Sequence, residues 1–378
     1  MIPFNKPYLT GKETDYIHDA VKSGKLSGNG KYTKLCQTFF EDKYKFKKCL
    51  LTTSCTDALE MAAILLNIKA GDEVIMPSYT YVSTANAFVL RGATIIFCDS
   101  DTNHPGIDAD KIETLITSKT KAIVPVHYAG MACDMAKIMD LSNQYNIPVV
   151  EDAAQAIDNY YTFPNGDVKS LGSIGHLSTF SFHETKNIIA GEGGMLAIND
   201  EAYIHRAEII WEKGTNRSAF FRGEVDKYGW VDVGSSFLPS EIVSAFLYAQ
   251  LMSLDDIQTK RKHIWNTYHE GLKVWAKNQN ISLPFQPKYS TNNAHMFYMV
   301  CETLEQRNAI IKRLKEKDIL SVFHYLSLHK SPFYKDKYVG QELLKSDKYT
   351  NRLIRLPLFY ELTDENLDYI TSSITQIS

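Results

Sequence analysis

The chain lacks several features that mark common protein classes. No apolar run approaches the ~20 residues that a membrane-spanning helix needs, and the first residues contain no apolar core typical of a signal peptide. We therefore expect no membrane association. The net charge is only −3, which argues against an extended nucleic-acid-binding surface. An anionic ligand would have to be bound by local hydrogen-bond donors.

The chain has few cysteines, and no two of them form a C-x-x-C pair. In a chain of 378 residues, dispersed cysteines are typical of reduced thiols, not of a disulfide or zinc framework. We therefore expect a cytoplasmic protein. The six cysteines are Cys36, Cys49, Cys55, Cys98, Cys133 and Cys301.

Three motifs of known chemistry are missing or incomplete. No G-x-x-x-x-G-K-[ST] segment is present, which excludes a P-loop nucleoside triphosphatase. Gly28 and Gly30 begin like a dinucleotide-binding fingerprint, but residue 33 is Thr and the first strong strand comes later, so a turn is favoured. His183 and Glu184 begin like an H-E-x-x-H zinc motif, but Asn187 replaces the second histidine.

What the chain does contain is a strand, a lysine and a glycine cluster in one stretch, LSTFSFHETKNIIAGEGG. Residues Leu177–Phe182 alternate apolar and small polar side chains, which predicts a strand. Lys186 follows in a polar turn, before Gly191, Gly193 and Gly194. An amine buried there loses its proton and acts as a nucleophile toward a carbonyl. The alternative is a solvated surface lysine, which is the commoner case for a lone lysine.

A second site makes the catalytic interpretation stronger. The apolar run Ile147–Val150 predicts a buried strand, and Glu151 and Asp152 stand at its carboxyl end, where α/β sheets bind ligands. Pyridoxal phosphate (PLP) needs an aspartate that keeps its ring nitrogen protonated and a lysine that binds its aldehyde. We predict PLP as the cofactor, with Lys186 and Asp152 as catalytic residues.

A phosphate site is predicted upstream. A short strand, Lys48–Thr52, is followed by Thr53–Asp57 and a helix, Ala58–Leu66. Serine and threonine at a helix start usually cap it, but the free N–H groups there also bind phosphate. Because the Lys–Asp pair requires a phosphorylated cofactor, we predict the phosphate site at Ser54, Cys55 and Thr56.

The order of elements predicts the fold class. Strands alternate with helices from Lys48 to Phe182, which indicates an α/β protein with a mostly parallel sheet. A long helix, Leu254–Lys277, precedes a strand–helix–strand pattern typical of a small α+β layer. We predict a large cofactor-binding domain with an N-terminal helical segment over residues 1–252, and a linking helix with a small C-terminal domain over 253–378.

Four motifs (SFHETKN…GEGG, VEDAAQ, TSCTDALEMA and MPSYTYVSTANA) together resemble the DegT/DnrJ/StrS family of sugar aminotransferases. These are PLP enzymes that act on nucleotide-linked keto-sugars. The resemblance runs from Ile2 to Leu358. It implies the type I (aspartate aminotransferase-like) fold and a homodimer with shared active sites.

The resemblance also implies roles for single residues. Tyr81 would stack on the cofactor ring, Gln155 would hydrogen-bond its 3-oxygen, and Ser181 would contact the phosphate. Ser236 stands where the family usually has an asparagine that reaches the partner's phosphate, so this chain departs from the pattern there. Lys186 separates the chain from family members that carry histidine at this position and act as dehydratases.

Several stretches resemble more specifically the family members that aminate TDP-4-keto-6-deoxy-D-glucose at C4 with L-glutamate. This implies a TDP-4-amino-4,6-dideoxyhexose product, with the galacto epimer favoured, for surface polysaccharides such as O-antigen or enterobacterial common antigen. Open alternatives are the gluco epimer, a 3-keto sugar substrate, and a PLP-binding sensor without turnover. A nicotinamide-dependent oxidoreductase is disfavoured by the missing glycine fingerprint.

Four residues are candidates for substrate contact. Arg217 lies in the polar and aromatic segment Gly214–Asp232, which we expect to reach a neighbouring subunit's site. His324 and His329 could bind a metal, but no carboxylate or cysteine lies nearby in sequence, so no metal is predicted and both are assigned to the wall of the sugar pocket. His183 is assigned to the substrate side of the lysine turn.

Overall fold

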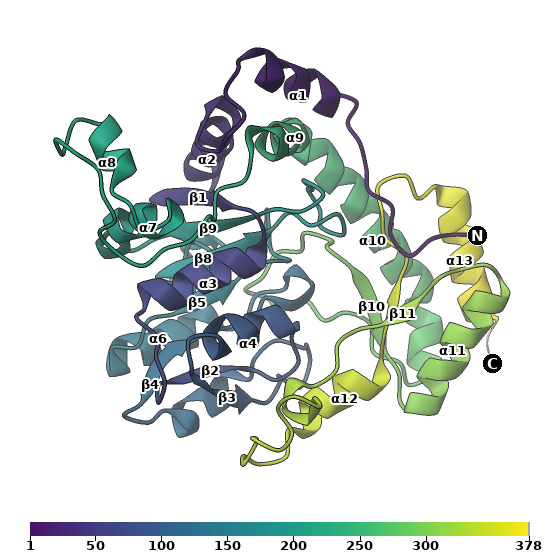
Figure 1. Cartoon of the computed structure of the whole chain (residues 1–378). Helices are drawn as coiled ribbons and strands as arrows, with labels where there is room; N and C mark the ends of the chain where they lie inside the picture. Colours follow the sequence, from purple (N-terminus) through teal and green to yellow (C-terminus); the bar gives the residue numbers. More distant parts are fainter. Residues whose placement is uncertain (377–378) are drawn as a thin grey trace.

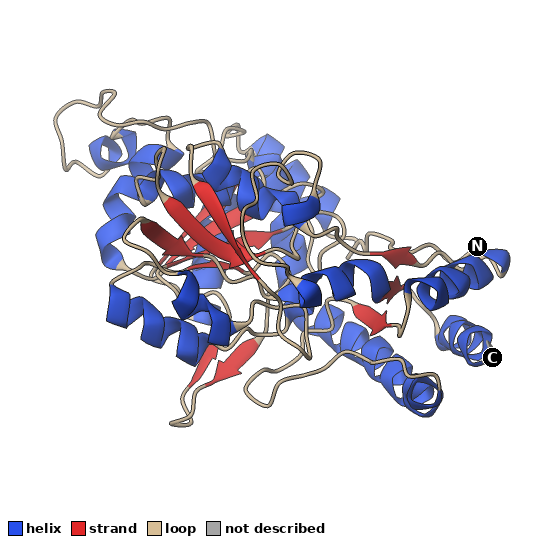
Figure 2. Ribbon diagram, turned by 90° about the horizontal axis from the view of Figure 1, so that it is seen from below, coloured by secondary structure: helices blue, strands red, loops and turns tan. Residues whose placement is uncertain are grey.

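The computed structural model describes residues 1–376 and is built around a mostly parallel sheet (Figures 1 and 2). Four strands are ordered β1-β9-β8-β5 and three are ordered β3-β2-β4. Parallel bridges from Ile123 to Val149 and from Val126 to Asp152 join the two groups. Among the strands of this sheet that the structure describes, β9 alone is antiparallel to the others. The strands are β1 (Lys48–Thr52), β2 (Glu73–Pro77), β3 (Thr94–Cys98), β4 (Thr120–Ile123), β5 (Val150–Asp152), β8 (Leu177–Ser181) and β9 (Gly194–Ile198).

Helices cover both faces of this sheet, because its strands are apolar on both sides (Figure 2). Successive side chains of a strand point to opposite faces, so Leu50 joins one core and Leu51 the other. Helices α3 (Cys55–Leu65), α4 (Val82–Val89) and α7 (Ile204–Trp211) pack on the Leu50 side. Helices α2 (Lys31–Tyr44), α6 (Met135–Tyr145) and α9 (Glu241–Met252) pack on the Leu51 side, and the short α5 (Ala109–Ile112) lies there too.

A smaller antiparallel sheet follows the long helix α10 (Leu254–Asn278). Its strands are ordered β10-β12-β11, with β10 (Phe297–Val300), β11 (Val322–Phe323) and β12 (Leu353–Leu356). A separate apolar core joins it to α10, α11 (Leu304–Glu316) and α13 (Asp364–Thr375), and α12 (Leu344–Arg352) precedes β12. The predicted α+β layer is therefore present. The boundary at residues 252 and 253 stays a prediction.

The start of the chain contacts both parts. Ile2 forms a parallel bridge with Ile319 beside the small sheet, and Figure 1 shows the N-terminus close to α13. Helix α1 (Glu13–Lys22) then packs against α9. The predicted turn at Gly30 is confirmed. The Glu241 carboxylate accepts hydrogen bonds from the Gly30 and Tyr32 N–H groups at 2.9 and 2.7 Å. A glycine is needed here because a Cβ at position 30 would lie 2.5 Å from the carboxyl carbon of Glu241.

The sequence did not reveal three pieces of structure. The hairpin of β6 (Tyr160–Thr162) and β7 (Val168–Ser170) and the short helix α8 (Arg217–Phe221) were not predicted. Strand β12 was missed as well, because a four-residue strand between α12 and a proline carries little periodic signal. None of the helices within residues 1–376 is long and apolar enough to cross a membrane.

Candidate active site

A cavity of about 640 Å³ opens between the carboxyl ends of the main strands and the small sheet. It gathers most of the predicted site residues from five separate parts of the chain. Those that line it are Ser54, Cys55, Thr56, Tyr81, Asp152, Gln155, Ser181, His183, Lys186 and His324.

Lys186 lies in the turn that follows β8. Its backbone N–H donates to the His183 carbonyl at 2.9 Å, which closes the turn, and its side chain lines the cavity. Burial lowers the pKa of Lys186, while the thiol of Cys55 and the carboxyl of Asp152 act in the opposite direction. The amine is therefore more easily deprotonated than that of a surface lysine.

Asp152 ends β5 and faces the same cavity. Its Oδ2 accepts a hydrogen bond from the Thr84 hydroxyl at 2.7 Å, and its Oδ1 accepts one from the Ala154 N–H at 3.2 Å. Burial raises the pKa of Asp152, against the lowering effect of these two donors and of Lys186. A cationic group placed beside this carboxylate would offset the cost of its burial.

The N-terminus of α3 forms one end of the cavity. Ser54 caps the helix, because its hydroxyl accepts from the Asp57 N–H at 3.0 Å, and the Thr56 hydroxyl donates to Ser83 at 2.8 Å. The first N–H groups of a helix have no intrahelical acceptor. Gly194 lets the sheet approach this turn, since a Cβ there would lie 2.4 Å from the Cys55 nitrogen.

Two further predicted residues have defined surroundings. Tyr81 is 57% exposed and lines the cavity, with its ring centroid 5.9 Å from that of Tyr325. The Gln155 side chain accepts from the Ala129 N–H at 2.6 Å and donates to the Tyr325 hydroxyl at 3.2 Å. The second bond leaves the Gln155 amide nitrogen facing the cavity wall.

Arg355 was missed by sequence reasoning. It stands on β12 and lines the cavity, its guanidinium lies 4.6 Å from the Phe4 ring centroid, and its buried Nε has no hydrogen-bond partner. No carboxylate within residues 1–376 forms an ion pair with it. Burial lowers the pKa of Arg355, and the Tyr128 hydroxyl opposes this. An arginine within the apolar run LIRLPL was the available signal.

The two predicted substrate histidines differ in placement. His324 lines the cavity, and its Nδ1 lies 2.8 Å from the Tyr128 hydroxyl. His329 does not: it is buried beneath the wall, with Nδ1 2.7 Å from the Ser78 hydroxyl and Nε2 3.7 Å from Asp347. The prediction for His329 is wrong because its 3₁₀ turn directs the ring into the core between β2 and α12. His295, which was not predicted, lines the cavity instead.

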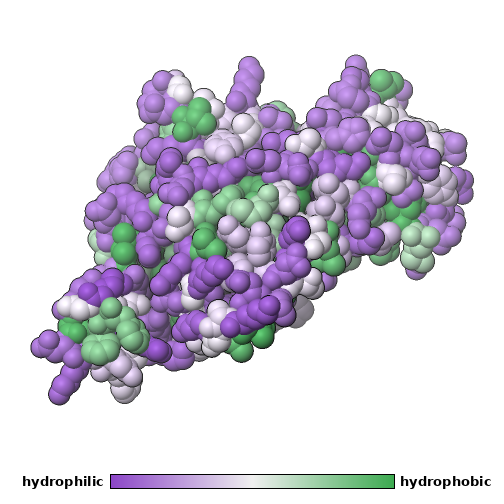
Figure 3. Space-filling view, turned by 90° about the horizontal axis from the view of Figure 1, so that it is seen from above, coloured by the Kyte–Doolittle hydropathy of each residue, from purple (hydrophilic) through white to green (hydrophobic). Residues whose placement is uncertain are grey.

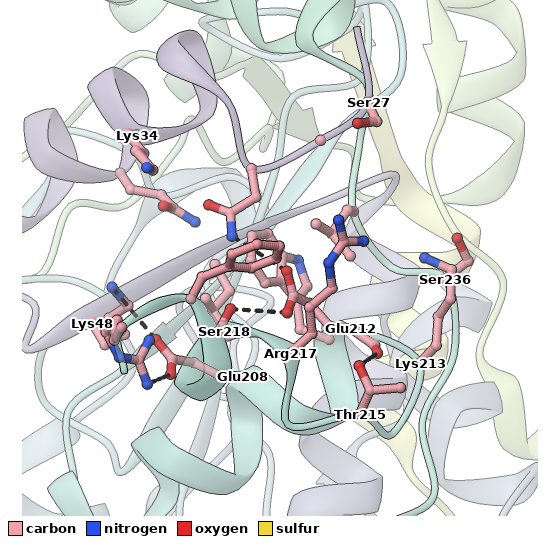
Figure 4. A pocket seen from close by; sticks show the side chains of 18 of the residues that line it. Ser27, Lys34, Lys48, Glu208, Glu212, Lys213, Thr215, Arg217, Ser218 and Ser236 are labelled. Atoms are coloured by element: carbon pink, nitrogen blue, oxygen red, sulfur yellow. Dashed lines mark hydrogen bonds and ion pairs between the residues drawn. The ribbon is translucent and has the colours of Figure 1, made fainter. Parts of the chain in front are cut away.

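Arg217 and Ser236 line a different cavity, of about 900 Å³, between α2, α7 and α8 (Figure 4). Figure 4 shows Arg217 beside Glu212 and Ser218, and the Ser218 hydroxyl donates to Glu212 at 2.9 Å. Neither Arg217 nor Ser236 lines the Lys186 cavity of its own chain. Their contact with a neighbouring subunit stays a prediction.

Comparison with known proteins identifies this arrangement. The model of the DegT/DnrJ/EryC1/StrS aminotransferase family matches residues 7–375. The chain belongs to this family. It is 34% identical over 382 residues to GDP-perosamine synthase of Escherichia coli O157:H7, covering 99% of this chain and 98% of that protein. The putative sugar aminotransferase Spr1654 of Streptococcus pneumoniae, in its PLP form, is 27% identical with a TM-score of 0.87 over 99% of this chain and 97% of that one. DesV of S. venezuelae is 26% identical with a TM-score of 0.89 over 99% and 98% of the two chains.

The family assignment makes the chain a PLP-dependent sugar aminotransferase. The residues present fit this cofactor. The cavity offers a helix N-terminus for a phosphate, a buried carboxylate for the ring nitrogen and a lysine of lowered pKa for the aldehyde. Within the described residues, no cluster of His, Cys, Asp and Glu could hold a metal ion.

Proposed function

We propose that the enzyme transfers the amino group of L-glutamate to C4 of TDP-4-keto-6-deoxy-D-glucose. The expected product is the TDP-4-amino-4,6-dideoxyhexose of galacto configuration, for surface polysaccharide synthesis. The observation that carries this proposal is the single cavity that contains Lys186, Asp152 and the unpaired Arg355. The resemblance of Phe182–Asn187, Glu212–Arg217 and Asn293–Tyr298 to TDP-sugar transaminases supports the choice of sugar.

Several groups of this chain would hold PLP, with Lys186 bound to its aldehyde. The phosphate of PLP would accept hydrogen bonds from the Cys55 and Thr56 N–H groups and from the Ser181 hydroxyl. Asp152 would bind the protonated ring nitrogen, and Tyr81 would cover one face of the ring. When bound, PLP supplies an electron sink that makes the α-proton of an amino acid acidic. The buried Asp152 maintains this property, because its negative charge favours the protonated ring nitrogen.

Lys186 would move the proton. Its Nζ would accept the proton from the α-carbon of the donor as a base and would then give a proton back as an acid. The lowered pKa of Lys186 suits both steps, because burial makes the neutral amine more accessible than that of a surface lysine.

Arg355 supports an amino acid as the donor. A buried guanidinium without a carboxylate partner is unfavourable until an anion reaches it, and its planar donors match a carboxylate. We assign Arg355 to a carboxylate group of glutamate. The ring of Phe4 packs against the same guanidinium, with its centroid 4.6 Å away.

A GDP-linked sugar is the second candidate, supported by the 34% identity to GDP-perosamine synthase. The gluco epimer, a 3-keto substrate and a PLP-binding sensor without turnover are further alternatives. The test is the visible absorption spectrum of the purified protein alone, then with L-glutamate, then with each keto-sugar. We expect a yellow band that glutamate bleaches and TDP-4-keto-6-deoxyglucose restores.

The outcomes separate the alternatives. Restoration only by a GDP-linked sugar would keep the aminotransferase and replace the nucleotide. A band that glutamate does not bleach would favour a sensor, and NMR of the product would assign the C3 or C4 position and the epimer. No band after addition of PLP would overturn the cofactor site.

We further propose that the enzyme is a cytoplasmic homodimer. The segment containing α8 projects from the molecule and exposes apolar side chains (Figure 3), among them Trp230 at 86% and Phe221 at 69%. An exposed aromatic patch of this kind is typical of an interface. Sizing chromatography of the active protein tests this, and a strictly monomeric active enzyme would contradict it.

A further inference from the structure

The residue after the lysine, Asn187, has a side chain whose orientation is fixed. Its amide nitrogen lies 2.8 Å from the main-chain carbonyl of Asn293 and 2.8 Å from the Gln258 side-chain oxygen. A main-chain carbonyl can only accept a hydrogen bond, so the atom facing Asn293 must be the amide nitrogen, whichever way the Gln258 amide is turned. The Asn187 oxygen therefore faces the other way.

That oxygen determines the tautomer of His295. Asn187 Oδ1 lies 2.8 Å from His295 Nδ1, and an amide oxygen only accepts, so Nδ1 carries a proton. In the neutral ring the other nitrogen, Nε2, is then a hydrogen-bond acceptor. Burial lowers the pKa of His295, and the positive charges of Lys186, Arg261 and Arg355 add to this effect. The ring is therefore neutral.

The position of His295 is fixed as firmly as its tautomer. Arg261 of α10 donates to the His295 carbonyl at 2.6 Å and to the Ala294 carbonyl at 3.2 Å. Asn293 donates to the carbonyls of Gln155 and Ile157, both at 2.8 Å. The segment that carries His295 is thus tied to α10 and to the segment that follows Asp152.

Arg355 Nε is not alone in lacking a hydrogen-bond partner in this cavity. Within residues 1–376, no hydrogen bond is formed by His295 Nε2 or by Lys186 Nζ. Both side chains line the cavity, and Lys186 is the charge that acts most strongly on His295. A fixed acceptor in the same cavity can bind one of the N–H groups of this amine when the flexible lysine side chain turns toward it.

We infer that His295 is a positioning residue, whose Nε2 accepts a hydrogen bond from Lys186 Nζ while that amine moves the proton of the donor, with Asn187 holding the required tautomer. This inference rests on the proposed function of Lys186. The neutral amine has two N–H groups and one lone pair. When Lys186 donates one N–H to His295, the direction of the Nζ lone pair is fixed, and no proton passes to the imidazole ring.

The first test is the half-reaction with glutamate alone, in which no sugar takes part. His295→Leu removes the acceptor, and we expect the rate of bleaching by glutamate to fall about tenfold, the factor for one lost hydrogen bond. His295→Gln keeps an oxygen at the cavity end and should recover part of the rate. The exposed His263, which pairs with Asp364, gives a matched control in His263→Leu.

The second test uses the apoenzyme and needs no activity. In protein labelled with ¹⁵N-histidine, NMR should show His295 protonated at Nδ1 and unprotonated at Nε2 at neutral pH. Asn187→Asp places a carboxylate against Nδ1, which stabilises the imidazolium and protonates Nε2. This variant should lose the Nε2 acceptor signal, and its glutamate half-reaction should slow as in His295→Leu.

Specific results would overturn the inference. An Nε2–H tautomer in the wild-type apoenzyme would remove its basis. If His295→Leu leaves the glutamate half-reaction unchanged and raises only the KM for the sugar, Nε2 binds a sugar hydroxyl and the inference fails. If wild-type protein itself does not react with glutamate, the proposed function fails instead, and the NMR result still decides the tautomer.

Discussion

Glu151 and Asp152 are consecutive carboxylates of β5 with opposite surroundings. Glu151 points into the interior, where it accepts hydrogen bonds from the Gly172 and Ile174 N–H groups at 2.8 Å each and lies 2.9 Å from His127 Nε2. Asp152 faces the cavity. Alternation along the strand thus directs one acid into the interior of the protein and the other into the cavity.

Exchanging each acid for its amide should separate these roles. Glu151→Gln loses several charged hydrogen bonds inside the protein, and we expect it to lower the free energy of unfolding by about 1–3 kcal/mol. Asp152→Asn should lower turnover by orders of magnitude with a smaller effect on stability. Urea unfolding and steady-state rates measure the two effects, and wild-type turnover in Asp152→Asn would remove this aspartate from the mechanism.

Lys186 should react with amine reagents at lower pH than other lysines do. Burial lowers its pKa, so its amine is unprotonated, and reactive, at a pH where surface lysines are still charged. Acylation of the apoenzyme at a series of pH values, followed by mass spectrometry of peptides, measures this. Exposed Lys273 is the internal control. Labelling of both lysines with the same pH dependence would contradict a lowered pKa.

The Lys186→Ala variant should be inactive. It removes the only group that we assign to proton movement and to the covalent attachment of PLP. Borohydride reduction followed by mass spectrometry should show cofactor bound to wild-type protein and none bound to the variant. A fully active Lys186→Ala enzyme would refute the mechanism.

Replacing Arg355 should have opposite effects on stability and on function. Arg355→Met removes a buried charge without an ionic partner, so the apoenzyme should melt at a higher temperature. The same variant should raise the KM for glutamate by about 10- to 100-fold, the range for lost hydrogen bonds to a charged group. Arg313→Met, at an exposed position of α11, is the control. An unchanged KM for glutamate would show that Arg355 does not bind the amino donor.

Ser54 should contribute to stability apart from any cofactor contact. Ser54→Ala removes the cap of α3 and should cost about 1 kcal/mol, whereas Ser54→Gly should cost only a few tenths. Thermal melting of the apoenzyme compares the two variants. Equal melting temperatures for Ser54→Ala and wild type would show that the capping bond contributes nothing.

The sequence predicted those parts of the site that follow strands with strong patterns. Lys186 follows the turn after one predicted strand and Asp152 stands at the end of another, so their placement at one sheet edge followed from the α/β alternation. Arg355 lies in the small sheet and His295 lies just before its strand β10, and the position of this sheet over the main sheet is set by tertiary packing. Nothing in their local sequence states which cavity they line.

The prediction that His329 lines the sugar pocket is wrong for the same physical reason. Five residues separate it from His324, which suggests a shared loop surface, but the intervening turn rotates its ring toward Ser78. The position of β12 likewise depends on its pairing with β10, a segment distant in sequence. Local periodicity carries no information on such contacts.

The missing side chain of Gly194 limits how this active site can be redesigned. Any Cβ at this position meets the backbone of Ser54 and Cys55, and backbone cannot rotate aside as a flexible side chain can. A mutational library aimed at new sugar substrates should therefore leave position 194 unchanged and diversify the small sheet. Evolution toward a new acceptor can reshape one wall of the cavity while the wall built by β9 and α3 stays constant.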